Sequence, residues 1–486
     1  MSAPEWPEEG LPADARLRAA VLATADIVTA AAPVALALLG APPQPLEADA
    51  GDDRAAALER LAGVLRDLEN VDGPLGGDDE LDRLSLCHGV RRALAAADAS
   101  HPTGPEALEQ HLQLRLLRLL DGAPADLESL VQAVETGPAF LRGARPPAAA
   151  GSAAAGRLAL EAAGRLPRLL DACAAAGQEL ARGDLRLRLE GALGPLLQAG
   201  AEEAGWLLKE YLPAAADQSA VPPDTLRLGL GMPLEEVEAV AEAALADAVL
   251  ADPLPALGAE PGEAELLVQL ESFRETWFAE TSAPAAGIGS RPGTEVEVMR
   301  APSWLEPLVA PVGLVLPGPL SETPERLLVG AGEATAGEVA LLYAAEYLPW
   351  SASRRPPRLA RLLLPSPDAG EGWRAHVRAS TPGGPLPWAS ELSWRAALGL
   401  AAIAMSSRGA SLDDAAELVA AESGLPPQSA VLQCLHLRRR PLQALTFLAG
   451  RAAVARMVAG SGVERFLEAG PLSAAAVGRL PLSRPL

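Results

Sequence analysis

Residues 54–68 read RAAALERLAGVLRDL, and this stretch carries the pattern that decides the fold. Its large apolar residues recur at three- and four-residue spacing, namely Leu58, Leu61, Val64, Leu65 and Leu68. That spacing gathers them on one face of an α-helix and leaves charged residues on the other. Similar patterns fill most of the chain on either side. The sequence therefore predicts a mainly α fold.

Composition supports the same prediction. Hydrophobic residues make up 49% of the 486 residues, yet Phe, Trp and Tyr number only 5, 8 and 3. The apolar content is thus mostly Ala, Leu and Val, and the first two suit helices better than sheets. A chain of this length fits one large domain or two lobes. We expect a flexible tail over 1–14, an N-terminal helical lobe over 15–225 and a C-terminal helical lobe over 226–486, with a cleft between the lobes.

A minor β element is expected between residues 294 and 318. Val296–Met299 and Val312–Leu316 are short runs with β-branched residues, set among prolines and glycines. Helical sequence resumes at about 335–350. Further on, Ser411 with Asp414 predicts a capped helix start, and Gly424 predicts that helix's end.

The charge balance argues against nucleic acid as a partner. The formal net charge is −23, with 63 acidic and 40 basic residues, so the surface repels phosphate backbones. The densest basic runs are Arg438–Arg440 and the group Arg354, Arg355, Arg358 and Arg361. Both are short, and we interpret them as solvated helix ends.

The sequence predicts a cytoplasmic protein without a membrane span. Three widely separated cysteines (Cys87, Cys173 and Cys434) imply no disulfide framework and fit a reducing compartment. The first ten residues lack a basic signal-peptide region. The most apolar stretch, 19–40, is interrupted by Asp26 and Pro33, which favours buried helices over a transmembrane segment.

Several separated motifs resemble one protein family. They are Pro138–Leu141, Glu210–Pro213, Glu371-Gly372-Trp373, Arg395–Ala397, the run Pro441-Leu442-Gln443-Ala444-Leu445-Thr446-Phe447-Leu448-Ala449-Gly450, and Glu468–Leu472. In this order they are similar to the bacterial "domain of unknown function 885" family, helical relatives of zinc metallopeptidases. The resemblance covers most of the chain and implies a metallopeptidase-like fold.

The resemblance also locates a degenerate metal motif. The family's motif is His-Glu-x-x-Pro-Gly-His, and the matching stretch here is Ala345-Glu346-Tyr347-Leu348-Pro349-Trp350-Ser351. Both histidines are replaced, by Ala345 and Ser351. The resemblance makes Glu346 the counterpart of the general base and Glu371 that of a carboxylate ligand. Two carboxylates hold zinc weakly, so we expect no metal and no other cofactor.

Six residues are candidates for the inherited cleft: Glu346, Ser351, Glu371, His376, His436 and Gln443. A metal site rebuilt from Glu346, Glu371, His376 and His436 is a less favoured alternative, because His376 reads more simply as a partly buried histidine with a neighbouring partner. For Glu346 we favour pairing with Arg374 or Arg395 over chemistry, since a carboxylate in an apolar helix is costly to bury alone.

Three functional readings stay open. The leading one is a non-catalytic relative of the metallopeptidases, a pseudoenzyme, that binds a peptide, a small ligand or a protein through its cleft or surface. The protein partner could be a second copy of this chain or an active paralogue. The second reading is a metal-independent enzyme that uses cleft carboxylates and histidines as acid or base. The third is a weak metallopeptidase.

Overall fold

The computed structural model describes residues 8–31, 51–71, 75–96, 104–122, 124–145, 152–215, 221–250, 297–306, 308–309, 312–315, 326–330, 358–380, 388–461 and 472–477. The described chain is mainly helical, which confirms the predicted fold class. The predicted helix at 335–350 lies outside the described residues.

The helices of the first half are α1 (Ala15–Ala31), α3 (Gly51–Glu69), α4 (Gly77–Ala95), α5 (Gly104–Arg118), α6 (Pro124–Gly143), α7 (Ala153–Leu180), α8 (Gly183–Trp206), a π-helical turn η4 (Leu207–Tyr211), α9 (Leu212–Ala214), α10 (Pro223–Leu230) and α11 (Leu234–Leu250). Short 3-10 turns lie at Glu8–Gly10 (η1) and Leu119–Asp121 (η2).

The helices of the second half are α15 (Leu359–Leu362), α16 (Pro367–Ser380), α17 (Trp388–Ser407), α18 (Leu412–Ser423), α19 (Pro427–Arg439), α20 (Pro441–Ser461) and α22 (Ala474–Val477). Local signals explain several ends. Ser411 and Asp414 form the predicted capping box of α18, and Gly424 ends that helix in a left-handed conformation at φ 69°.

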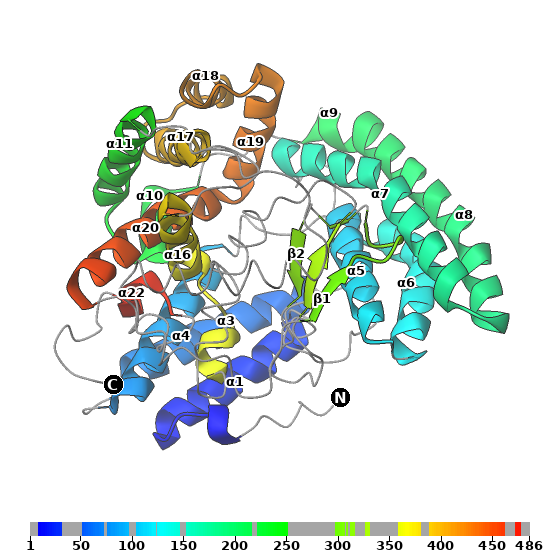
Figure 1. Cartoon of the computed structure of the whole chain (residues 1–486), viewed down its shortest axis with the longest axis horizontal. Helices are drawn as coiled ribbons and strands as arrows, with labels where there is room; N and C mark the ends of the chain where they lie inside the picture. The colour runs from blue at the N-terminus through cyan, green and yellow to red at the C-terminus, as the bar shows by residue number, and fades with distance from the viewer. Residues whose placement is uncertain are drawn as a thin grey trace.

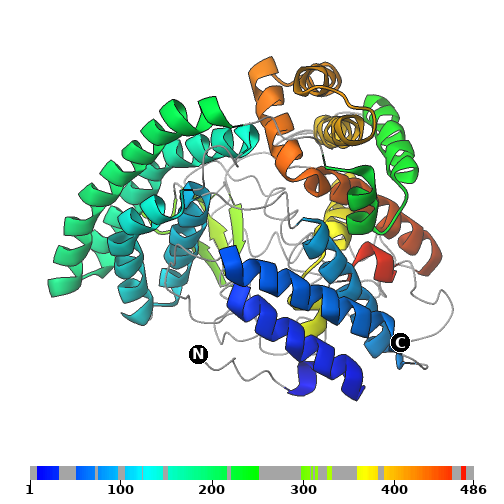
Figure 2. The same cartoon turned by 180° about the vertical axis from the view of Figure 1, so that it is seen from behind.

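Three main core clusters hold the described helices together (Figures 1 and 2). One joins α1, α3, α4 and α15, and includes the buried Leu61, Val64 and Leu68 of the amphipathic stretch. A second joins α5 to α8 with the small sheet. The third joins α10, α11 and α16 to α20. The predicted division into two lobes near residue 225 stays a prediction.

The sheet has three strands, β1 (Glu297–Arg300), β2 (Val312–Val315) and β3 (Arg326–Val329), in the order β1-β3-β2. β1 and β2 lie where the sequence places strands. β3 pairs parallel with β1 and antiparallel with β2. The sequence analysis missed β3, because its short Leu-rich run cannot be distinguished from helix by pattern alone. Leu328 joins the α5–α8 core, and the sheet lies beside α5 (Figure 1).

The flexible tail predicted over 1–14 does not extend to residue 14. The backbone N–H groups of Ala13 and Asp14 donate to the carboxylate of Asp79, at 3.3 and 2.8 Å. Asp14 in turn accepts from the N–H of Leu17 in the first turn of α1. A carboxylate from α4 therefore fixes the entry of the chain into α1.

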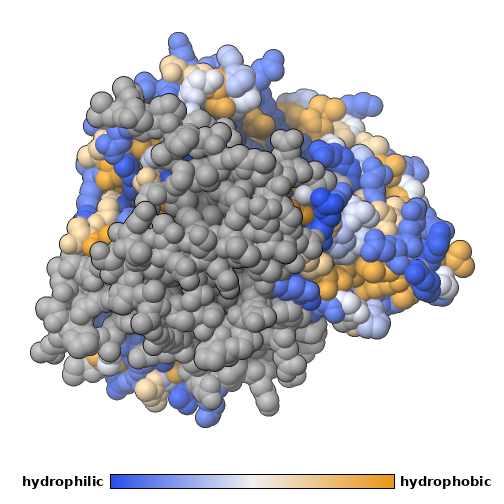
Figure 3. Space-filling model, in the orientation of Figure 1, coloured by the Kyte–Doolittle hydropathy of each residue, from blue (hydrophilic) through white to orange (hydrophobic). Residues whose placement is uncertain are grey.

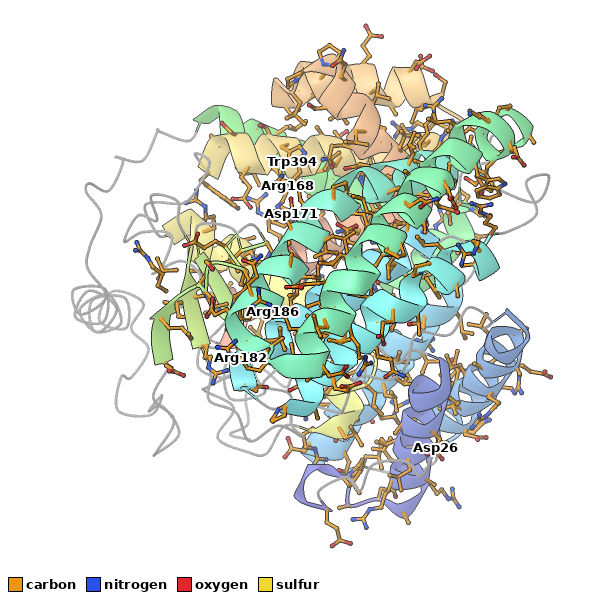
Figure 4. All side chains as sticks on the ribbon, turned by 90° about the vertical axis from the view of Figure 1, so that its right-hand side faces the viewer. Asp26, Arg168, Asp171, Arg182, Arg186 and Trp394 are labelled. Atoms are coloured by element: carbon orange, nitrogen blue, oxygen red, sulfur yellow. The ribbon has the colours of Figure 1, made fainter. Side chains whose placement is uncertain are left out.

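The outer surface of α7 and α8 is polar and ion-paired. Figure 4 shows this side, with Arg168 and Asp171 on α7 and Arg186 on α8. Exposed leucines also occur there, at Leu187 and Leu197, ten residues apart along α8. Figure 3 likewise shows hydrophobic residues among hydrophilic ones on the surface at its right. Such scattered exposure is ordinary for a protein surface.

A buried histidine in α5 predicts acid sensitivity. His111 is 8% exposed, and its Nδ1 lies 2.9 Å from Nη1 of the buried Arg115. Burial, with a smaller contribution from Arg115, lowers the pKa of His111 to about 4. The unfolded chain therefore binds this proton at higher pH than the folded one does. Stability is fully present above pH ~6.5 and falls as the pH drops toward 4, by roughly 3 kcal/mol in all.

Urea unfolding measured between pH 7.5 and 4.5 checks this expectation. His111→Gln keeps a hydrogen-bonding group for Arg115 and removes the titration. We expect a distinctly flatter pH profile for the variant than for the wild type. If the free energy of unfolding falls equally with pH in both proteins, other groups cause the acid sensitivity.

Candidate functional site

The structure describes four of the six predicted cleft residues. Glu371 and His376 lie on α16, His436 on α19 and Gln443 on α20. Glu346 and Ser351, with the rest of the degenerate metal motif, lie outside the described residues. The predicted pairing of Glu346 with Arg374 or Arg395 therefore stays a prediction.

α16 and α20 approach each other closely through two glycines. A methyl group on Gly372 would overlap the carbonyl group of Gly450, and one on Gly450 would overlap the carbonyl group of Asp368. Only residues without a Cβ allow backbones to pack at this distance. The neighbouring Trp373 is fully buried. Two of the motifs that carry the resemblance, one around Gly372 and one ending at Gly450, thus meet at a helix crossing.

Glu371 is held by arginines on two helices. Its Oε1 lies 3.3 Å from Nη1 of Arg374, and its Oε2 lies 3.2 Å from Nη1 of Arg395. Arg395 also contacts Glu391 through Nε at 3.2 Å. Both carboxylate oxygens of Glu371 are therefore used in ion pairs, one within α16 and one that joins α16 to α17.

Phe447 gives Arg395 a third partner. The guanidinium carbon of Arg395 lies 4.7 Å from the centre of the Phe447 ring, a cation–π contact. Phe447 is 1% exposed. Its ring thus helps to orient the arginine that binds Glu371.

Two adjoining pockets lie around this ion pair. Pocket 1, of about 350 Å³, is bounded by the end of α4, the start of α16 and the α19–α20 junction. Its lining residues include Arg92, Glu371, Arg439, Arg440, Gln443 and Thr446. Pocket 2, of about 270 Å³, lies between α17, α19 and α20. It is lined by Trp394, Arg395, Leu398, His436, Phe447 and others.

Arg440 and Gln443 line both pockets. Glu371 lines pocket 1 and Arg395 lines pocket 2, so their ion pair connects the two linings. Three predicted residues, Glu371, His436 and Gln443, are therefore brought together. Pro441 begins α20 at the junction, which places Gln443 in the first turn of that helix.

His436 lies at the edge of pocket 2 beside α7. Its Nε2 is 3.7 Å from Oε2 of Glu161. Burial lowers the pKa of His436, and Glu161 only partly opposes the shift. The imidazole is consequently neutral for the most part near pH 7.

His376 does not join the other candidates. It lies five residues after Glu371 on α16, which separates the two side chains by about 140° around the helix axis. Its ring centre is 5.5 Å from that of Trp373, and burial lowers its pKa. The partly buried packing role favoured for His376 matches this position.

The described residues offer no metal-ligand set. Among them, no group of three or more His, Cys, Asp or Glu side chains lies close enough to hold an ion. Glu371 is used by its two arginines, and His376 points elsewhere. The described residues by themselves therefore do not supply the ligands of a zinc centre, and the motif at 345–351 lies outside them.

The sequence analysis was wrong about two basic runs. Arg439 is 3% exposed and pairs with Glu106 of α5, 333 residues earlier in the chain. Arg361 is 6% exposed and its Nε donates to Asp82 of α4 at 2.6 Å. Neither arginine is at a solvated helix end, because a distant carboxylate compensates its charge. No local pattern signals these partners.

Comparison with solved structures shows the fold. The chain matches a "putative lipoprotein" from Colwellia psychrerythraea with a TM-score of 0.70 at 12% identity, covering 96% of this chain and 98% of that one. It matches a "putative lipoprotein of unknown function" from Shewanella oneidensis with a TM-score of 0.65 at 13% identity, covering 96% and 100%. This chain shares their fold. No family model and no curated protein matches it.

These neighbours overturn the predicted cytoplasmic location. Both are described as lipoproteins, a class anchored to membranes, and the cysteine and N-terminal arguments from sequence do not test for an anchor. Among the described helices, α20 is apolar and long enough to cross a membrane over Pro441–Ala459. Since 56% of that window is buried inside the structure, and core helices pass the same test, α20 carries no argument for a span.

Proposed function

We propose that this protein is a non-catalytic relative of the metallopeptidase-like proteins and binds a small ligand in pockets 1 and 2. The observation that carries the proposal is the convergence of Glu371, His436 and Gln443 on two adjoining pockets. Their volumes, about 350 and 270 Å³, suit a small molecule or a very short peptide.

The ion pairs around the pockets favour binding over catalysis. Both oxygens of Glu371 contact arginines, so this carboxylate is poorly placed to take a proton from a substrate or to hold a metal. Phe447 and the Glu371–Arg395 pair fix the wall between the pockets. A wall fixed before binding reduces the entropy lost when a ligand docks.

The pocket assignment predicts that Gln443→Trp blocks binding. Gln443 is exposed and lines both pockets, so an indole there fills space that a ligand needs. With indole and benzamide as neutral probes in ligand-observed NMR, we expect the variant to lose at least about 10-fold in affinity, equivalent to ~1.4 kcal/mol. Gln198→Trp, on the exposed side of α8, is the matched control and keeps wild-type binding. Equal binding by Gln443→Trp would place the ligand site elsewhere.

His436 supports a second candidate function, metal-independent acid–base chemistry. A mostly neutral imidazole beside Glu161 in pocket 2 is a reasonable base near pH 7. A turnover assay on fluorogenic peptides and esters, with and without zinc, separates the readings. Activity lost in His436→Gln would support this candidate, whereas zinc-dependent activity lost in Glu371→Gln would support a weak metallopeptidase. The binding proposal expects neither.

A further inference from the structure

Three residues that line the pockets carry buried N–H groups that have no acceptor among the described residues. They are Nη1 of Arg92 and Nη2 of Arg439 in pocket 1, and Nε1 of Trp394 in pocket 2. Trp394 is labelled in Figure 4. Leaving such a donor unpaired in a protein interior is unfavourable, and more so for a charged group. Donors that are left unpaired around one site suit an acceptor supplied by a ligand.

Arg439 is the most deeply buried of the three. It is 3% exposed, and its Nη1 is bound to Glu106. One nitrogen of the guanidinium is thereby satisfied by the protein, while Nη2 is not. A guanidinium presents several donors in a fixed plane, so fixing one edge orients the others.

Arg92 lies in the electrostatic field of a buried pair, His88 and Asp368. Asp368 attracts it electrostatically. Oδ2 of Asp368 lies 3.3 Å from Nε2 of His88, and both of these side chains are 2% exposed. Burial lowers the pKa of Arg92 and that of Arg439, which reflects the cost of keeping two cations out of water.

The fixed charges of pocket 1 are predominantly positive. Arg92, Arg439 and Arg440 line it together with one carboxylate, Glu371, which is paired with Arg374 and Arg395. Glu106, which does not line the pocket, compensates part of the charge of Arg439 and Arg440. The partial charges of the helix ends cancel at the pocket. The positive N-terminal ends of α16 and α20 lie there together with the negative C-terminal ends of α4 and α19. The excess of arginines over carboxylates in this lining contrasts with the net charge of −23 of the whole chain.

We propose that the ligand is a small organic oxyanion, a carboxylate or a phosphate monoester. Its charged end lies in pocket 1 against Arg92 and Arg439, and its apolar part lies in pocket 2 against Trp394 and Phe447. Arginine donors match the paired oxygens of both groups. This inference rests on the proposed function, because it assumes that the two pockets bind one ligand.

Calorimetry with phenylacetate, phenyl phosphate and the neutral phenylacetamide tests the inference. For the wild type we expect at least one of the two anions to bind ~10-fold or more tightly than the amide. The tighter anion distinguishes a carboxylate ligand from a phosphate ligand. Arg92→Met should weaken the preferred anion on the order of 10- to 100-fold and leave the amide unchanged.

Two controls keep the test independent of folding. Arg91→Met removes the adjacent arginine of α4, which forms an exposed ion pair with Glu69 of α3. This variant should bind all three probes like the wild type. Arg92→Met loses the attraction to Asp368 and should melt somewhat lower, so its unchanged binding of the amide is the control for an intact pocket. Arg439 is a poor choice for substitution, since it is the nearer of the two arginines that compensate the charge of the buried Glu106.

The possible failures are distinguishable. If the amide binds as tightly as both anions, or if Arg92→Met binds the anions normally, the oxyanion inference is wrong and the proposed function stands. If none of the probes binds the wild type, and indole and benzamide do not bind it either, both the inference and the proposed function fail.

Discussion

Gly372→Ala is expected to destabilise the protein by about 3 kcal/mol or more, whereas Gly370→Ala, two residues earlier on the same helix, is expected to stabilise it slightly. A methyl group at residue 372 would overlap the backbone of Gly450 and Arg451 on α20. Backbone atoms cannot move aside as a flexible side chain would, so α16 and α20 must separate. At Gly370 nothing lies within 4 Å of the added carbon, and alanine is the better helix former.

Urea unfolding of the two variants gives the difference directly. Separation of α16 from α20 would also move Glu371 away from Gln443, so Gly372→Ala should lose probe binding in the pockets. Gly370→Ala should retain it. Equal stability of the two variants would mean that α16 and α20 do not cross as closely as described.

Asp82→Asn is expected to cost about 3–5 kcal/mol, the second large effect. Asp82 is completely buried, with Oδ1 2.6 Å from Nε of Arg361 and Oδ2 2.5 Å from Nη2 of Arg358. Asparagine keeps the size of the side chain but removes the charge that compensates two arginines. Asp78 and Asp79 lie near the same arginines and would compensate only part of the loss.

The matched control is Asp171→Asn on the exposed side of α7 (Figure 4). We expect it to change the free energy of unfolding by less than about 0.5 kcal/mol. Thermal melting and limited proteolysis would follow both variants. Asp82→Asn should expose α1 to protease as well, since Asp79 of the same cluster holds the residues that precede that helix. A variant as stable as the control would show that the cluster adds little to stability.

Local patterns predicted much of the fold. The three- and four-residue spacing over 54–68 falls inside α3, and Leu61, Val64 and Leu68 are buried as the pattern requires. Ser411 and Gly424 bound α18 as their capping chemistry indicates. These features depend on residues within a few positions of one another, which is why one sequence suffices to find them.

The site was predicted in part. Glu371, His436 and Gln443 lie at the pockets, but Arg92, Arg439 and Trp394 were missed. Arg439 looked solvated because its partner, Glu106, is 333 residues away in the chain. Pairings at such separations depend on tertiary structure and produce no periodic pattern in the sequence. His376 was placed too near the site because distance along the chain was considered without the rotation of the helix.

The Asp78–Asp82 cluster also bears on the order in which a growing chain can fold. Its arginines, at 358 and 361, leave the ribosome some 276 residues after Asp82 does. Until then Asp78 and Asp82 lack their arginine partners, although the apolar residues of α4 can already pack on α1 and α3. Helices α5 to α8 are consecutive and largely pack on one another, so they can assemble first. The ion pairs that join α4 to Arg358 and Arg361 would then be among the last contacts to form.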